Sequence, residues 1–279
     1  MRRSRFILGK GAVAGVLLLA TACGGGGGGG GASPTGSAAA FMTLKPGVLT
    51  VGSCLAYPPF EYYKGGKLLG FDVELMQNIA DRLGLKIEWV KANFKTIFTA
   101  LDGGQFDAVA AASTITPERA QVVDFSIPYY NANQSLTANV KKTPDVKNVD
   151  DLKSGDVVGV QAGTTGEMWA KDNLVPEGIQ LKEYTEAPTA FTDLEAGNIV
   201  GVINDEPSSR SEVETRPDLE VVQPIVTKEQ YGFALRKQNP ALEKAVNDAL
   251  RELFKDGTYA ELFKKYVPRF PLGSVLASG

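Results

Sequence analysis

The class of fold follows from residues 48–90, which read VLTVGSCLAYPPFEYYKGGKLLGFDVELMQNIADRLGLKIEWV. The apolar run 48–51 predicts one strand, and residues 86–90 predict another. Between them, Phe71, Leu75 and Ile79 recur at helical spacing, and Gly84 suits the position just after a helix, so residues 71–83 are predicted to be helical. A strand, a helix and a strand in this order are typical of α/β proteins with a mostly parallel sheet.

The same alternation continues after residue 90. It predicts strands over 106–112, 157–160, 181–184, 199–203 and 231–235, and helices over 94–101, 117–123, 164–170, 189–195 and 241–254. A folded part of this size exceeds the usual single hydrophobic core, so we expect two lobes.

The residues before the first strand have the pattern of an export signal, predicted over 1–22. Basic side chains up to Lys10 precede a charge-free run over 11–22 that is too short to span a membrane. Cys23 follows at once, as lipoprotein processing requires, although Ala20 stands where that motif usually has Leu. The Ala-x-Ala tripeptide at 20–22 would also serve an ordinary signal peptidase. Lipidation of Cys23 is the favoured prediction, with residues 23–43, which include eight consecutive glycines, as a flexible tether.

The composition excludes several kinds of chemistry. The 279 residues contain no histidine and two cysteines, so Ser-His or Cys-His catalysis, His-ligated metals and Cys-rich zinc sites are excluded. Without residues 1–22, 257 residues remain, and their 25 basic and 32 acidic side chains give a net charge of −7. Because no basic cluster remains, nucleic-acid binding is not expected. We expect no metal and no cofactor.

The first candidate for ligand binding lies in residues 113–119, STITPER. Thr116 is a good N-cap and Pro117 suits the first helical position, which places Arg119 in the first turn of a helix. There a cation opposes the helix dipole by about 0.3–1 kcal/mol. Such a placement favours an anionic partner, and the planar guanidinium group matches a ligand carboxylate. The alternative is a surface arginine paired with Glu118 or Asp124.

The second candidate is Asp205, which ends the segment IVGVIND at 199–205. Ligands of open α/β sheets bind beyond the carboxyl ends of the strands, where a fixed anion would hold an ammonium group. Alternatively, Asp205 or Glu206 caps a helix that Pro207 would begin.

Aromatic side chains in loops after apolar strands form a third group. Aromatic residues more often belong to the core than to a binding site, and Phe60 is interpreted in this way. Tyr57 and Phe94 are candidates for the walls of a ligand pocket.

Several motifs occur in a fixed order along the chain. They are GSCLAYPPFE at 52–61, GFDV at 70–73, STITPER at 113–119, VDFS at 123–126, PY at 128–129, VGVQAGTT at 158–165, Asp205, YGFA at 231–234 and DGTY at 256–259. With these motifs the chain resembles, over about residues 44–268, the polar amino-acid-binding proteins of bacterial ABC importers, which are the family 3 extracellular solute-binding proteins.

The resemblance implies an α/β fold, a two-lobed clamp like the type II periplasmic binding proteins. Lobe 1 would comprise 44–131 and 232–270, and lobe 2 would comprise 132–231. Two crossing strands near 130–136 and 230–234 would form the hinge.

The resemblance also implies how the backbone groups of an amino acid are held. The carboxylate-binding arginine of the family falls on Arg119, assisted by Thr114 and, from the opposite lobe, by Thr165. The ammonium-binding aspartate falls on Asp205, assisted by the backbone carbonyl of Ala112.

The side-chain specificity is predicted from the remaining positions. The aromatic sandwich of the family falls on Tyr57 and Phe94. Cationic-amino-acid binders of the family carry an acid at the position of Cys54, whereas here it is a thiol, and Gln161 and Asn204 both donate and accept hydrogen bonds. Because these residues provide no fixed charge, we predict a neutral polar ligand such as glutamine.

The implied function is capture of an amino acid and its delivery to the membrane permease of an ABC transporter. The protein would be an exported monomer at the cell surface or in the periplasm, anchored to the membrane through Cys23. Some relatives of the fold are dehydratases, and Glu167 would be the acid of such an enzyme. The favoured interpretation of Glu167 is a helix first-turn residue. A sensory module is the third alternative and would depend on a partner protein.

Overall fold

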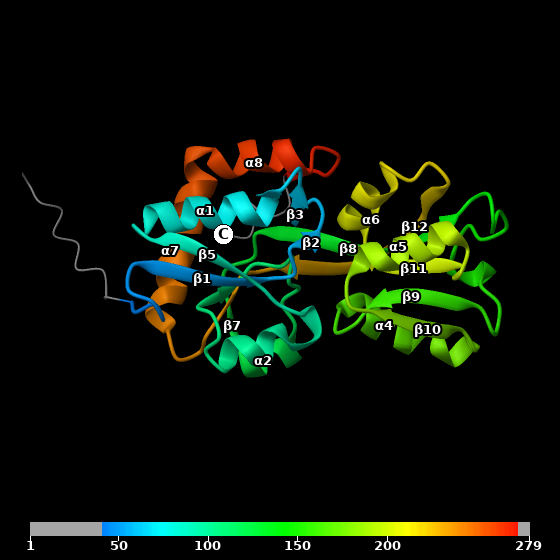
Figure 1. Cartoon of the computed structure of the whole chain (residues 1–279), viewed down its shortest axis with the longest axis horizontal. Helices are drawn as coiled ribbons and strands as arrows, with labels where there is room; N and C mark the ends of the chain where they lie inside the picture. Colours follow the sequence, from blue (N-terminus) through cyan, green and yellow to red (C-terminus); the bar gives the residue numbers. More distant parts are fainter. Residues whose placement is uncertain (1–40, 273–279) are drawn as a thin grey trace, which may run out of the picture. The chain divides into compact units, whose positions relative to one another are not determined.

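The computed structural model describes residues 41–272, and these form two lobes, each built on a five-stranded sheet (Figure 1). The predicted export signal, Cys23 and the tether up to residue 40 lie outside the described residues. Within residues 41–272, no helix combines the length and the apolar character that crossing a membrane requires.

The sheet of lobe 1 has the strand order β5-β1-β6-β13-β7. Its strands are β1 (Val48–Ser53), β5 (Lys86–Lys91), β6 (Ala108–Val109), β7 (Asp124–Phe125) and β13 (Ala234–Leu235). β1 pairs in parallel with β5 and β6, and β13 is antiparallel to β6 and β7. This geometry places the chain after β1 and after β6 at the same edge of the sheet.

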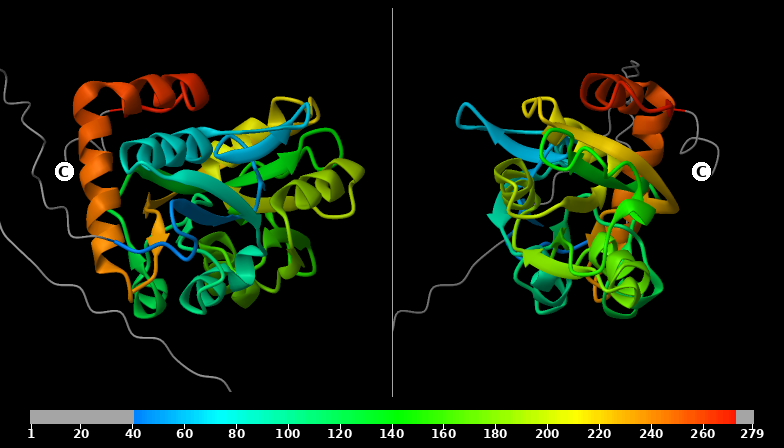
Figure 2. Two further views of the ribbon diagram at one scale, coloured as in Figure 1. Left: turned by 60° about the vertical axis from the view of Figure 1, so that its left-hand side comes forward. Right: turned by 90° about the vertical axis from the view of Figure 1, so that its right-hand side faces the viewer.

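Helices cover both faces of this sheet. α1 (Phe71–Arg82), α7 (Pro240–Asp256) and α8 (Thr258–Tyr266) pack together on one side, as Figure 2 also shows, and α2 (Ile97–Asp102) packs on the other with the 3-10 turn η1 (Phe94–Thr96) and α3 (Pro117–Val122). The two faces bury separate apolar clusters, one around Leu49 and Leu75 and one around Ile97 and Val109.

A small antiparallel sheet joins the start of α1 to the loop after β1. It contains β2 (Ala56–Tyr57), β3 (Glu61–Lys64) and β4 (Lys67–Leu69). Gly70 has a φ of +138°, and a Cβ atom there would lie 2.0 Å from the carbonyl oxygen of Phe60, so only glycine fits. Through this close approach, the backbone N–H of Asp72 donates to the same oxygen at 3.0 Å, and the motifs at 52–61 and 70–73 meet.

The sheet of lobe 2 has the order β10-β9-β11-β8-β12. β9 (Val157–Gln161) is parallel to β10 (Gln180–Tyr184) and β11 (Gly201–Asp205), whereas β8 (Tyr130–Asn139) is antiparallel to β11 and β12 (Leu219–Tyr231). α4 (Thr165–Asn173), α5 (Ala187–Ala196) and α6 (Glu206–Val213) pack against it, with short 3-10 turns η2 (Val149–Asp151) and η3 (Val175–Glu177) in its loops.

The chain passes between the lobes twice, from β7 into β8 and from β12 into β13. β8 and β12 pair with each other, with Tyr130 opposite Tyr231 at the end next to lobe 1. The crossings coincide with the segments in which the hinge is predicted.

The structure differs from the sequence-based expectations in several places. The small sheet β2-β3-β4 and the helices α6 and α8 were not predicted, and the helix predicted over 94–101 is divided into η1 and α2. Both sheets are mixed rather than mostly parallel, because β13 in lobe 1 and β8 and β12 in lobe 2 run antiparallel to their neighbours. The strand predicted over 106–112 is reduced to β6, and Ala112, beyond the end of β6, has a φ of +45°. The strand predicted over 231–235 is interrupted at Gly232, whose N–H donates to the carbonyl oxygen of Ser113 at 3.0 Å.

Candidate ligand-binding site

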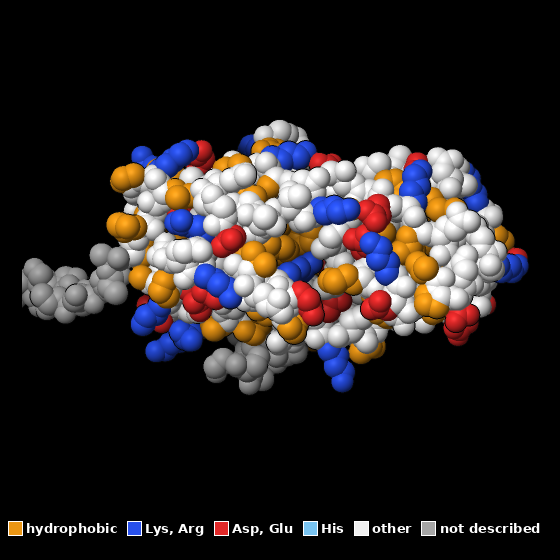
Figure 3. Space-filling view, turned by 90° about the horizontal axis from the view of Figure 1, so that it is seen from below, with side chains coloured by type: hydrophobic (Ala, Val, Ile, Leu, Met, Phe, Trp, Pro, Cys, Tyr) orange, Lys and Arg blue, Asp and Glu red, His pale blue; other side chains and the backbone are white. Residues whose placement is uncertain are grey.

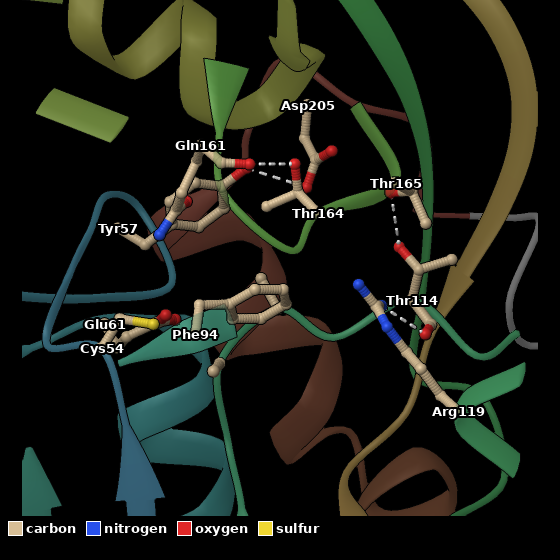
Figure 4. Close-up of a pocket in the computed structure, with 12 residues that line it drawn as sticks. Cys54, Tyr57, Glu61, Phe94, Thr114, Arg119, Gln161, Thr164, Thr165 and Asp205 are labelled. Carbon is tan, nitrogen blue, oxygen red and sulfur yellow. Dashed lines mark hydrogen bonds between the residues drawn. The ribbon is translucent and has the colours of Figure 1, made fainter. Parts of the chain in front are cut away.

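Residues of both lobes line one pocket (Figure 4). Nine of the ten residues predicted to bind the ligand are among them, and Asn204 is not. The pocket encloses about 10 Å³ of free volume, which is room for roughly one water molecule. An amino acid therefore enters only when the surrounding groups move apart. The lining residues are Cys54, Tyr57, Glu61, Phe94, Ala111, Ala112, Thr114 and Arg119 from lobe 1 and Gln161, Thr164, Thr165 and Asp205 from lobe 2.

Arg119 is held in the pocket by its own helix start. The Thr116 side chain caps α3 by accepting the Arg119 backbone N–H at 3.2 Å. The buried guanidinium group donates to the backbone oxygens of Thr114, at 2.8 Å, and of Gly163 in lobe 2, at 3.1 Å. Burial lowers the pKa of Arg119 to about 10, so the group stays cationic at neutral pH. Among residues 41–272, Arg119 forms no ion pair with any carboxylate, Glu118 and Asp124 included, so the cation is available to an anionic ligand.

Asp205 reaches the pocket from the end of β11 in lobe 2. It directly precedes α6, but its side chain does not cap that helix. Instead its Oδ2 atom accepts hydrogen bonds from the hydroxyl groups of Tyr57, at 2.8 Å, and Tyr231, and its Oδ1 atom lies 2.5 Å from the Gln134 Nε2 donor. Burial first, and then the charge of Glu229, raise the pKa of Asp205 to about 6. Asp205 is therefore mostly ionised at neutral pH.

A buried acid fixes the backbone of Ala112, whose carbonyl group is predicted to assist ammonium binding. The φ of +45° at Ala112 is unusual for a residue other than glycine. Its N–H donates to the Oδ2 atom of Asp72 at 2.9 Å, and the same oxygen accepts the Tyr129 hydroxyl at 2.7 Å. The GFDV motif thus contributes the side chain that holds this turn of the pocket wall.

Aromatic rings lie between the predicted charge sites. Tyr57 and Phe94 both line the pocket and are nearly buried, whereas Phe60 belongs to the core, where its ring packs edge-on against Tyr130 with centroids 5.2 Å apart. The guanidinium carbon of Arg119 lies 5.2 Å from the centroid of the Phe94 ring. Phe94 therefore contacts the cation and also forms part of the wall beside it.

The residues predicted to face the ligand side chain differ in position. Cys54 is a buried free thiol on the pocket wall, and Gln161 lines the pocket while its amide donates to the Thr185 backbone oxygen at 3.1 Å. Asn204 lies behind the wall, with its Oδ1 atom 3.0 Å from the Tyr57 hydroxyl. Asn204 is thus placed to orient Tyr57 rather than to contact a ligand.

Glu61 is a pocket residue that the sequence reasoning missed. Its side chain is completely buried, and within the described part of the chain neither carboxyl oxygen has a hydrogen-bond partner. Burial, and then the charges of Asp72 and Asp205, raise the pKa of Glu61 well above its usual range. The available signal was an acid directly after the Pro-Pro-Phe segment of the first motif.

Glu229 of β12 is the second residue that was missed. Its Oε2 atom accepts hydrogen bonds from the hydroxyl groups of Thr114 and Thr165, both at 2.6 Å, and its Oε1 atom accepts from Gln134 Nε2 at 2.9 Å and from the Thr227 hydroxyl at 2.8 Å. The two threonines predicted to assist the ligand carboxylate therefore already share a carboxylate of the protein.

Ion pairs also join the lobes outside the pocket. Lys91 lies 2.7 Å from Glu186, and Lys95 lies 3.1 Å from Glu183, in each case with the lysine in lobe 1. On the face seen in Figure 3, basic and acidic side chains lie next to each other around a central hollow. Because these pairs are partly exposed, each contributes little to closure, on the order of 0–1 kcal/mol.

Glu167, the acid of the enzyme alternative, does not line the pocket. Its Oε2 atom accepts the Gly163 backbone N–H at 2.6 Å, and its carboxylate pairs with Lys171 one turn along α4. The favoured interpretation of Glu167 as a structural residue in the first turn of the helix agrees with these contacts.

Comparison with known proteins places the chain among binding proteins. Residues 49–269 match the family described as bacterial extracellular solute-binding proteins, family 3. The chain is 37% identical over 224 residues to the L-cystine-binding protein TcyJ of Escherichia coli (strain K12), which covers 79% of this chain and 82% of that protein.

Solved structures extend the similarity to the fold. An ancestral arginine-binding protein bound to arginine superposes with a TM-score of 0.76 at 38% identity, covering 79% of this chain and 98% of the other. The same kind of ancestral protein bound to glutamine gives 0.75 at 38% identity, covering 80% and 99%.

These relatives are named for binding and not for catalysis, and the match spans both lobes. The resemblance seen in the motifs is confirmed, as is the two-lobed α/β fold that it implies. The chain is a member of the family 3 bacterial extracellular solute-binding proteins.

Proposed function

We propose that this protein captures an amino acid between its lobes and delivers it to the membrane permease of an ABC transporter. One observation carries the proposal: a buried guanidinium group without a carboxylate partner and a buried carboxylate from the other lobe line the same pocket. A zwitterion needs one fixed cation and one fixed anion, and Arg119 and Asp205 supply them.

Binding of the ligand favours closure of the two lobes. Each charge-assisted hydrogen bond contributes about 1.5–3 kcal/mol. Since Arg119 and Asp205 belong to different lobes, both bonds form only in the closed arrangement, and ligand binding shifts the population towards it. The permease would recognise this closed form. Acylation of Cys23, outside the described residues, would keep the protein at the membrane.

The proposed class of ligand side chains is wider than the class predicted from the sequence. A neutral ligand such as glutamine was inferred from a pocket without a fixed side-chain charge, and Cys54 and Gln161 fit that premise. The carboxyl group of Glu61 does not fit it, because it adds an acid to the wall. Polar amino acids with neutral or basic side chains are therefore the proposed ligands, which accords with the arginine and glutamine complexes of the ancestral relative.

A thermal-shift screen against the twenty amino acids tests the proposal. Binding to the folded state stabilises it by about 2.7 kcal/mol at a ligand concentration one hundred times Kd, so a ligand raises the melting temperature. Arg119→Ala and Asp205→Asn are expected to abolish the shift while leaving the protein folded. Arg251→Ala, at an exposed position of α7, is the control and should respond like the wild type. If no amino acid shifts the wild type, or if both site variants still respond, the proposal is wrong.

A further inference from the structure

Two side chains of the protein, Glu229 and Gln134, contact the same groups that would hold the backbone of an amino acid. The Oε2 atom of Glu229 accepts hydrogen bonds from the hydroxyl groups of Thr114 and Thr165, both at 2.6 Å. Figure 4 shows these two hydroxyl groups facing each other. The Nε2 atom of Gln134 lies 2.5 Å from the Oδ1 atom of Asp205. A carboxylate of the protein thus binds where the ligand carboxylate is expected, and an amide N–H binds where the ammonium group is expected.

The two side chains are also bonded to each other, and we call them the internal pair. Gln134 Nε2 donates to the Oε1 atom of Glu229 at 2.9 Å, and the Thr227 hydroxyl donates to the same oxygen at 2.8 Å. Burial lowers the pKa of Arg119, whereas the charges of Asp205 and Glu229 oppose that effect. The negative charge of the internal pair therefore lies near the cation proposed for the ligand carboxylate, as the carboxylate of a bound amino acid would.

An irregularity in β12 directs Glu229 into the pocket. Between Ile225 and Glu229 the pairing with β8 shifts, so that four steps along β12, from 225 to 229, correspond to two along β8, from 134 to 132. Lys228 has a φ of +55°, and the side-chain oxygen of Asn133 accepts the backbone N–H groups of Thr227 and Lys228, both at 3.1 Å. Extra residues of this kind re-aim a side chain beside functional sites. The local structure of β12 thus serves to present the Glu229 carboxylate.

An amino acid offers the pocket a bond that the internal pair lacks. Arg119 donates only to backbone oxygens in the described residues, so a ligand carboxylate would add a charge-assisted hydrogen bond. Gln134 is fully buried, and its Oε1 atom has no hydrogen-bond partner within residues 41–272. A buried acceptor without a partner is unfavourable. Both features allow a ligand to displace the internal pair.

We propose that Glu229 and Gln134 form an internal substitute for the amino acid, which joins the two lobes before a ligand binds and which the ligand must displace. The link across the cleft is the hydrogen bond between Glu229 and Thr114, since Thr114 belongs to lobe 1. The inference goes beyond the proposed function, because it concerns the protein before an amino acid enters. The free protein is then largely closed, and its opening limits the rate of ligand binding.

Small-angle X-ray scattering of the free protein, refolded to remove any bound amino acid, tests this closed state, since an open clamp has the larger radius of gyration. Glu229→Gln should increase the radius. Each carboxyl oxygen of Glu229 accepts from two donors, so an amide turned either way places its own N–H groups against donors. Glu220→Gln, at an exposed position of β12, is the matched control and should keep the wild-type radius.

A second variant tests the same bond from the other lobe. Thr114→Val removes the hydroxyl group and retains the shape of the side chain, so it should give the same larger radius as Glu229→Gln. The double variant should be no larger than either single variant, because both substitutions remove one shared contact. Circular dichroism checks that all three variants are folded.

Stopped-flow tryptophan fluorescence measures the rate of binding with the tightest amino acid of the thermal screen. An internal pair that keeps about two thirds of the molecules closed slows association about threefold. Glu229→Gln is therefore expected to bind at least about threefold faster than the wild type, and Glu220→Gln at the wild-type rate.

The outcomes separate this inference from the proposed function. Equal radii for the wild type and a folded Glu229→Gln protein overturn the inference, as does a double variant larger than both single variants or an unchanged association rate. Amino-acid binding would still stand in each of these cases. If no amino acid binds, the proposed function fails, and the scattering of the free protein still decides whether the internal pair closes the lobes.

Discussion

The hydroxyl oxygens of Thr114 and Thr165 lie 3.5 Å apart, although the two residues belong to different lobes. Both hydroxyl groups donate to the same oxygen of Glu229, on a strand that links the lobes. The carboxylate of Glu229 thus occupies the donors that the family resemblance assigns to the carboxylate of the ligand. An incoming amino acid meets a negative charge that the protein already holds at this point.

Glu229→Gln is therefore expected to bind amino acids more tightly, by about three- to tenfold, because a like charge beside the ligand carboxylate is removed. The measurement is the Kd from calorimetry, with Glu220→Gln, an exposed acid of the same strand, as the control. Weaker binding by Glu229→Gln would show that the bridge favours closure more than it opposes the ligand.

The affinity should also depend on pH through Asp205. Only the ionised carboxylate holds an ammonium group, and burial raises the pKa of Asp205 to about 6. As the pH falls below about 6, the folded protein protonates Asp205 and the affinity is lost, by up to about tenfold per pH unit; above about pH 7 it is nearly constant. Calorimetry with glutamine between about pH 5 and pH 8 measures this. Asp205→Asn should bind weakly at every pH, and a wild-type Kd that stays constant down to pH 5 would contradict the assignment.

Gly163 permits the lobes to meet. It has a φ of +82°, and a Cβ atom there would lie 2.7 Å from the Cα atom of Lys95 in lobe 1. Gly163→Ala should weaken ligand binding about tenfold or more, because a steric cost of about 1–3 kcal/mol opposes closure. Gly155→Ala is a matched control: its φ is +94°, but nothing lies within 4 Å of the added Cβ atom. Both variants should lose similar stability from backbone strain. If both bind normally, the closed contact at Lys95 is not needed for binding.

Local periodicity predicted six of the eight α-helices in the described residues and missed α6 and α8. Apolar positions at helical spacing located α1 and α7 to within two residues at each end. This is possible because the buried face of a helix consists of apolar residues spaced three or four apart in the sequence. Strand direction was not predictable in this way. β8, β12 and β13 run antiparallel because the chain crosses between lobes, and a run of apolar residues carries no information about its neighbour in a sheet.

Arg119 and Asp205 were predictable as site residues because each carries a charge at a position where its local structure does not favour one. Arg119 is a cation in the first turn of a helix, and Asp205 is an acid at the end of a buried strand. No comparable local pattern in the sequence marks Glu61 or Glu229 as a site residue. Glu61 is buried only because Gly70 brings α1 against β3, and Glu229 meets Thr114 and Thr165 only when β12 passes between the lobes.

Calorimetry with modified ligands tests the pairing of Arg119 and Asp205 with a zwitterion. The tightest amino acid of the thermal screen would be compared with its methyl ester, which lacks the carboxylate, and with its N-acetyl derivative, which lacks the ammonium group. Since each derivative loses charge-assisted bonds of about 1.5–3 kcal/mol each, we expect each to bind at least about 100-fold more weakly than the parent. Methyl ester and N-acetyl derivatives that bind as tightly as the parent amino acid would contradict this account.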